Sequence, residues 1–88
     1  MKKIEYHGNS NVISQQLKLG RTKAGLSQSD LAARLQVFDI NMDQQMISKI
    51  EHNARIVTDY ELACICMVLK TTPEEMLADF YGELGEEK

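Results

Sequence analysis

Apolar residues recur along most of this chain at intervals of three and four positions, a spacing that places them on one face of an α-helix. The alternating pattern of a half-buried strand is almost absent. Signals for helix starts and ends divide residues 11–81 into five segments, so we predict a compact all-α domain of five short helices. Residues 1–10 are predicted to form an N-terminal arm with a short extended piece at Lys3–Tyr6, and residues 82–88 an acidic, disordered tail.

The first two predicted helices cover residues 12–24 and 28–38. Gly25 is well placed to end the first helix, because glycine readily adopts the left-handed conformation found at helix C-termini. Ser27 precedes the second helix, where its hydroxyl can accept a hydrogen bond from a free N–H of the first turn. The inward faces are formed by Ile13, Leu17 and Ala24 in the first helix and by Leu31, Ala32 and Leu35 in the second.

The third predicted helix covers residues 44–52 and follows a turn at residues 39–42. Asp43 is its predicted N-cap, and Asn53, which tolerates the left-handed conformation, is predicted to end it. Ile47 and Ile50 face inward.

Two further helices are predicted from capping signals. Thr58 and Glu61 have the spacing of a capping box before a helix over residues 59–70. A second box, Thr72–Glu75, places Pro73 at the first position of a helix that continues to Tyr81. The inward faces are formed by Leu62, Ile65, Cys66 and Leu69, and then by Met76, Leu77 and Phe80.

The outward face of the third predicted helix carries the candidate chemistry: Gln44, Gln45, Ser48, Lys49 and His52. Glutamine can pair with the N6 and N7 atoms of adenine, and lysine can donate to the O6 and N7 atoms of guanine. Two glutamines by themselves favour an ordinary solvated face, so this pattern needs the support of the surrounding sequence.

That support comes from an ordered set of segments: Arg21–Gln28, Asp30–Leu35, Asp43–Glu51, and Tyr60–Leu62 followed by Leu69. Over residues 12–78 the chain resembles the lambda repressor/Cro-like, or xenobiotic-response-element, helix-turn-helix family. The resemblance implies that the third helix enters the DNA major groove and presents its N-terminal residues to base edges.

The resemblance also implies roles for individual residues. Gln28 would contact the DNA backbone from the start of the second helix. Arg21 and Glu51 would form a structural ion pair between the first and third helices. Arg55 is a candidate phosphate contact, while Lys18 and Lys23 are weaker candidates that are equally well explained as solvated charges.

The chain departs from the family pattern at several positions. The connection between the second and third helices is longer than usual, which predicts a longer second helix and a wider turn at residues 38–42. Gly20 replaces a leucine, and Leu19 beside it is expected to compensate in part. Asn53 replaces a glycine, and Ala54 replaces a basic residue that commonly contacts phosphate.

Charge is distributed unevenly along the chain, which has a net charge of −3. Residues 1–55 contain eight Lys/Arg and five Asp/Glu, a balance of 8 − 5 = +3, whereas residues 56–88 contain two and eight, a balance of 2 − 8 = −6. This asymmetry favours contact between the first part and a polyanion, although a weakly polar domain with an acidic end would show the same balance.

Other functional classes are predicted to be absent. Cys64 and Cys66 are about 200° apart around a helix and cannot share a metal ion, and His7 and His52 lack companions for a metal or catalytic site. We expect no enzyme activity, cofactor, metal or small-molecule ligand. No apolar run approaches the roughly 20 residues that span a bilayer, and we expect a cytoplasmic protein without a secretion signal.

The outward face of the fourth predicted helix is unusually apolar and comprises Tyr60, Ala63, Cys64 and Met67. We expect this face to form a homodimer interface, unless the arm or the fifth helix covers it. The predicted function is that of a dimeric transcriptional repressor on a palindromic operator in double-stranded DNA. A protein-interaction module on the same fold, such as an antitoxin or an antagonist, is the alternative.

Overall fold

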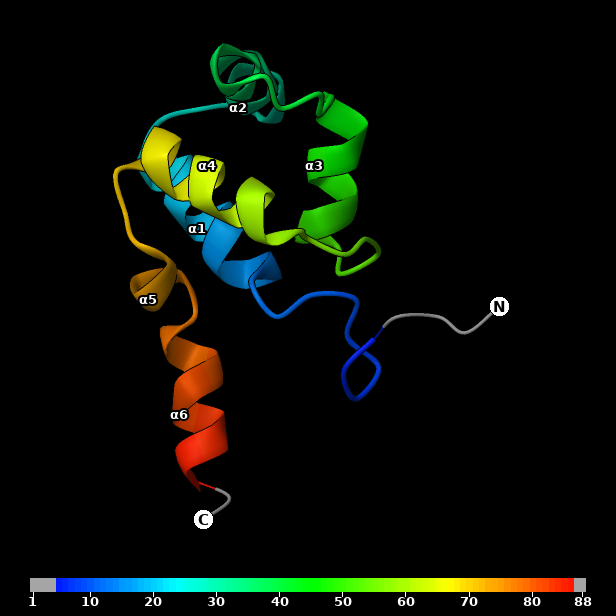
Figure 1. The fold of residues 1–88 in the computed structure, drawn as a ribbon, viewed down its shortest axis with the longest axis vertical. Helices are drawn as coiled ribbons and strands as arrows, with labels where there is room; N and C mark the ends of the chain where they lie inside the picture. Colours follow the sequence, from blue (N-terminus) through cyan, green and yellow to red (C-terminus); the bar gives the residue numbers. More distant parts are fainter. Residues whose placement is uncertain (1–4, 87–88) are drawn as a thin grey trace.

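The computed structural model describes residues 5–86 (Figure 1). This part of the chain contains six α-helices and one short 3-10 helix. In chain order they are α1 Ser14–Lys23, α2 Gln28–Leu35, η1 Gln36–Phe38, α3 Gln44–Glu51, α4 Asp59–Leu69, α5 Pro73–Met76 and α6 Ala78–Glu86. The predicted all-α class is confirmed. The predicted fifth helix is divided in two, because the backbone leaves helical geometry at Leu77, the C-cap of α5.

Four helices begin at the predicted cap residues. The side chains of Ser27, Asp43, Thr58 and Thr72 each accept a hydrogen bond from the backbone N–H three residues later. Gly25 has a φ of 74°, which directs the chain out of α1 as predicted. These local bonds satisfy N–H groups that have no partner inside their own helices, and they fix where each helix starts.

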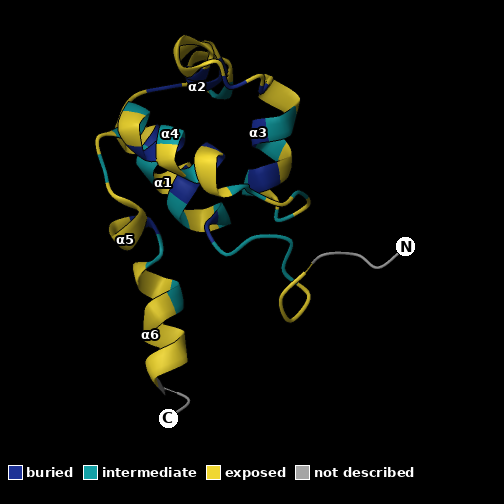
Figure 2. Ribbon diagram, in the orientation of Figure 1, coloured by how far each residue is buried: buried dark blue, intermediate teal, exposed yellow. Residues whose placement is uncertain are grey.

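The core lies where α1, α2, α3 and α4 meet, and its largest fully buried side chains are Leu17, Leu31, Leu35, Met42, Ile47, Ile50 and Ile65. Figure 2 shows buried segments in α1, α3 and α4, whereas α6 is exposed along most of its length. Ala24 is exposed, so its predicted inward orientation is wrong. It stands at the C-cap of α1, where the helix has already ended.

The second helix extends over the predicted residues 28–38 as α2 followed directly by η1, but the connection to α3 differs from the wider turn predicted at residues 38–42. α2 ends at Leu35, a 3-10 turn follows, and Asp39 adopts a left-handed conformation with a φ of 60°. The chain then turns inward and buries Ile40 and Met42 in the core. Ile40 and Met42, in the longer connection before α3, therefore add apolar contacts to the core, whereas a turn exposed to solvent would not.

Gly20 is explained by the packing of α1 against α4. A Cβ atom at this position would approach Leu69 Cδ1 to 3.3 Å, so a larger side chain would displace Leu69. Leu19 is largely exposed and does not replace the missing leucine, contrary to expectation.

The C-terminal end of the domain is more ordered than predicted. Residues 82–86 continue α6 and do not form a disordered tail, while residues 87–88 lie outside the described residues. Residues 1–4, which hold half of the extended piece predicted at Lys3–Tyr6, also lie outside them; Tyr6 pairs with Asn9 in an isolated bridge. None of the helices in the described part has the length and apolar composition needed to cross a membrane.

Candidate nucleic-acid interface

The predicted base-reading residues share one side of α3. Gln44, Gln45, Lys49 and His52 are exposed, and Ser48 is half-buried. Ile47 and Ile50 on the opposite side are fully buried, which fixes the rotation of the helix about its axis. Figure 1 shows α3 at the edge of the molecule, so its outward side is open to a large partner.

Two glutamine side chains link α3 to α2. Gln44 Nε2 donates a hydrogen bond of 2.6 Å to Gln28 Oε1, and Gln28 Nε2 donates one of 3.0 Å to Glu51 Oε1. Gln44 stands at the first position of α3 and Glu51 at the last, so Gln28 connects both ends of this helix to the start of α2.

Arg21 completes this polar chain from α1. Its Nε donates to Glu51 Oε2 at 2.6 Å, its Nη2 to Glu51 Oε1 at 3.1 Å, and its Nη1 to the Leu26 carbonyl at 2.8 Å. The two side chains are 11% and 2% exposed. Burial alone would raise the pKa of Glu51, but the hydrogen bonds from Arg21 and Gln28 outweigh burial and lower it. The predicted ion pair between Arg21 and Glu51 is therefore present, and Glu51 is ionised at neutral pH.

The polarity of this chain determines what Gln44 can offer to a ligand. The Glu51 carboxylate only accepts, so Gln28 must direct its NH₂ group toward Glu51 and its oxygen toward Gln44. Gln44 keeps its carbonyl oxygen and one N–H for an outside partner. This donor and acceptor pair matches the N7 and N6–H₂ groups of adenine.

His52 differs from the other residues of this face. Its Nδ1 lies 2.7 Å from the Ser48 carbonyl oxygen and 3.4 Å from Ser48 Oγ, so the ring folds back along α3. The side chain of Lys49, by contrast, is exposed and forms no hydrogen bond or ion pair with any other residue in the described part of the chain.

The candidate backbone contacts occupy different surroundings. Lys18 is exposed on α1 and close enough to Glu51 for its charge to act on that carboxylate. Lys23 lines a cavity formed with residues of α4 and α5, and no residue of α3 contributes to that cavity.

Arg55 has a structural partner that the sequence analysis missed. Its Nη1 and Nη2 donate to the two carboxylate oxygens of Glu61 at 2.9 and 3.0 Å. Burial would raise the pKa of Glu61, but the hydrogen bonds from Arg55 and Thr58 lower it. The sequence signal for this pair is a capping-box glutamate six residues after an arginine. The pair holds the loop after α3 against the start of α4.

Asn53 also has a role beyond its backbone conformation. It has the predicted left-handed geometry, with a φ of 58°. Its Oδ1 accepts from the N–H groups of Ser10 and Asn11 at 2.8 and 3.1 Å, and its Nδ2 donates to Asn9 Oδ1 at 2.6 Å. Glycine could adopt the same backbone conformation but could not hold the arm beside the end of α3.

Taken together, the helix pair and the polar chain behind it define a helical DNA-binding module. A helix-turn-helix family model matches residues 17–76, and the chain belongs to this lambda repressor-like, or xenobiotic-response-element, family of DNA-binding regulators. The family is generally non-enzymatic. No curated protein matches the chain.

Proposed function

We propose that this protein is a sequence-specific transcriptional repressor that binds a palindromic operator as a homodimer. The observation that carries the proposal is the hydrogen-bonded chain from Gln44 through Gln28 and Glu51 to Arg21. It holds an exposed glutamine in one orientation before any ligand binds, which reduces the entropy lost on binding.

We assign base reading to Gln44, Gln45, Ser48, Lys49 and His52. Gln44 and Gln45 stand at the N-terminal end of α3, the end that helix-turn-helix proteins direct toward base edges. Lys49 follows one turn later and suits guanine. His52 is at the far end of the face, and its ring is already engaged with Ser48, so we expect it to contribute least.

We assign contacts with the DNA backbone chiefly to Gln28 and Lys18. Gln28 keeps one amide N–H after bonding to Glu51, and it stands at the first position of α2, where helix N–H groups favour a phosphate. Arg55 is a secondary candidate because Glu61 occupies its guanidinium. We assign no contact with the DNA backbone to Lys23, because it lines a cavity to which no residue of α3 contributes.

We infer that two copies associate through the outer face of α4. Tyr60 and Met67 are 60% and 66% exposed, Ala63 is exposed as well, and Cys64 is half-buried. A second apolar cavity, bounded by the arm and Phe80, opens beside Leu62 and does not include these four residues. An exposed apolar face is suited to a two-fold interface, in which the same residues meet across the axis.

Selection of bound sequences from a random DNA pool tests the proposal. We expect enrichment of a palindrome whose half-sites lie about 34 Å apart, centre to centre, as two recognition helices in successive major grooves require. Absence of any enriched sequence would contradict base reading and favour the alternative of a protein-interaction module.

A further inference from the structure

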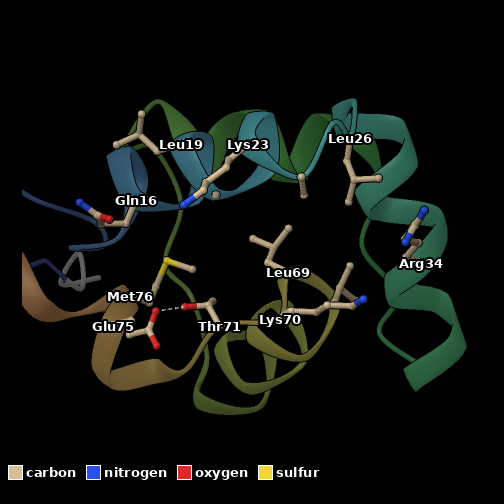
Figure 3. A pocket seen from close by; sticks show the side chains of 13 residues that line it. Gln16, Leu19, Lys23, Leu26, Arg34, Leu69, Lys70, Thr71, Glu75 and Met76 are labelled. Atoms are coloured by element: carbon tan, nitrogen blue, oxygen red, sulfur yellow. Dashed lines mark hydrogen bonds between the residues drawn. The ribbon is translucent and has the colours of Figure 1, made fainter.

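A cavity of about 660 Å³ lies between α1, α2 and the region where α4 passes into α5. Figure 3 shows Leu69 and Met76 in its interior, with Lys23 reaching in from α1 and Lys70 from the end of α4. This cavity is separate from the α3 face, because none of its lining residues belongs to α3.

The cavity has an excess of positive charge. Three cationic residues line it, Lys23, Arg34 and Lys70, against one carboxylate, Glu75. Glu75 already accepts a hydrogen bond from Thr71 Oγ1 at 3.1 Å. The side chains of Lys23 and Lys70 form no hydrogen bond or ion pair with another described residue, and Arg34 acts electrostatically on Asp30, which does not line the cavity. A lining that is partly apolar and carries an excess of positive charge favours an occupant that is both apolar and acidic.

Helix α6 has these two properties. Around its axis, Phe80, Tyr81 and Leu84 fall within about 100°, and the acidic residues Asp79 and Glu83 within about 40° on the other side. α6 contains no basic residue. Tyr81 is 52% exposed, and Figure 1 shows the helix extending away from the rest of the domain.

The hydrogen bond and the ring contact that join α6 to the arm and α1, among the described residues, lie in its first turn. Asp79 accepts a hydrogen bond of 2.6 Å from Gln16, and the ring of Phe80 lies 5.4 Å from that of Tyr6. Beyond this turn the helix contains Gly82 and Gly85, and each glycine costs about 1 kcal/mol relative to alanine. A helix of this length is marginal without tertiary packing, so its distal turn favours a binding partner.

We propose that α6 of one copy docks into the Lys23–Arg34–Lys70 cavity of a second copy. The apolar side of α6 would cover Leu69, and Glu83 would face the cations. α6 starts immediately after the cavity-lining residues of α5 and runs away from them, so it cannot enter the cavity of its own chain. The contact is therefore between different surfaces of two copies, and it leaves α3 uncovered. One short helix gives a small interface, which is typical of weak association.

Titration of two complementary variants, without DNA, tests this contact by NMR. The ¹⁵N-labelled protein carries Glu83→Lys and Leu84→Asp, which disable α6 and leave the cavity intact. The unlabelled partner carries Lys23→Glu and Lys70→Glu, which disable the cavity and leave α6 intact. Because all four positions are exposed, both variants should fold, and the dispersion of the labelled spectrum verifies this for the labelled protein.

We expect the amide signals of residues 69–76 in the labelled protein to shift progressively and to saturate. The matched control is an unlabelled partner that also carries Glu83→Lys and Leu84→Asp, and it should leave these signals in place. Dimerisation through α4 is common to both titrations and cannot produce the difference. Unmoved signals, or equal shifts with the control partner, would overturn the proposal. A parallel titration uses decanoate, an organic anion with an apolar chain. Shifts produced by decanoate but not by the partner would assign the cavity to such an anion and would also overturn the proposal.

Discussion

The carboxamides of Gln44 and Gln28 are joined by a hydrogen bond of 2.6 Å, and Gln28 is bonded in turn to Glu51. Gln44 is exposed at the first position of α3, whereas the side chain of Glu51 is only 2% exposed. The Gln44 side chain, which is proposed to read DNA, is thus held in place by hydrogen bonds that lead to the buried carboxylate of Glu51. The two glutamines should consequently act as one unit in binding.

A double-mutant cycle tests this coupling. We expect Gln44→Ala to weaken binding to a selected operator by about 1–3 kcal/mol, with little change in stability, because the side chain points away from the core. Gln28→Ala should weaken binding too, because Gln44 then loses the hydrogen bond that orients it. The double variant should lose less binding free energy than the sum of the two single variants, because either substitution alone already breaks this hydrogen bond. Fluorescence anisotropy with operator and random DNA provides the measurement.

Gln36→Ala is the matched control for this cycle, since Gln36 is exposed on η1 and forms no part of the polar chain. Its operator affinity should be unchanged. Equal losses on operator and random DNA for Gln44→Ala would mean that Gln44 does not read bases.

Arg21→Ala should destabilise the fold more than it alters DNA contact. Removal of the guanidinium leaves the buried Glu51 carboxylate without its ion-pair partner, which costs about 3 kcal/mol and lowers the Tm by more than roughly 10 °C in a domain of this size. Thermal unfolding monitored by circular dichroism measures the change. Arg34→Ala, an exposed arginine on α2, should shift the Tm only slightly. An unchanged melt with lost DNA affinity would make Arg21 a phosphate ligand instead.

Stability should fall in acid because of Glu51 and Glu61. The folded state lowers the pKa of both carboxyls below the ordinary value of 4.5. The unfolded chain therefore binds more protons in acid, so the stabilisation is complete above that value and is lost as the pH falls through the folded pKa values. Urea unfolding between about pH 3 and pH 6 should show the free energy of unfolding declining toward low pH.

Glu51→Gln should flatten this acid decline, whereas Glu74→Gln, at an exposed carboxyl of α5, should leave its slope as in the parent protein. Parallel curves for the parent protein and Glu51→Gln would show that the Arg21–Glu51 pair contributes nothing to the acid sensitivity.

Met67→Glu should separate the two-fold dimer. The substitution places two like charges near the axis of the proposed α4 interface, and Met67 is too exposed for the change to disturb the core. Sedimentation in dilute solution should show monomers, with weaker operator binding and an unchanged circular dichroism spectrum. A variant that remains dimeric would locate the interface in the arm or in α6.

Features that depend on neighbouring residues were predictable from the sequence. The caps at Ser27, Asp43 and Thr58 are bonds between residues three apart, so their spacing alone identifies them. The inward positions Ile47 and Ile50 follow from helical periodicity. The left-handed residue at Asn53 follows from its side-chain type and its place after a helix.

Features that depend on tertiary contacts were not predictable in this way. Ile40 and Met42 occur among turn-forming residues, and only the packing of α2 against α3 buries them. The Gln28–Gln44 bond joins residues 16 positions apart. The acidic composition of residues 82–88 predicted disorder, and a helix that contains Gly82 and Gly85 could not be inferred from propensity alone.

Salt dependence of binding to the selected operator tests the central claim most directly, because the chain has a net charge of −3 and yet is proposed to bind a polyanion. If the dimer neutralises about six phosphates, the logarithm of the association constant should fall with the logarithm of salt concentration at a slope near −5. A slope near zero would contradict the account and remove DNA as the main partner.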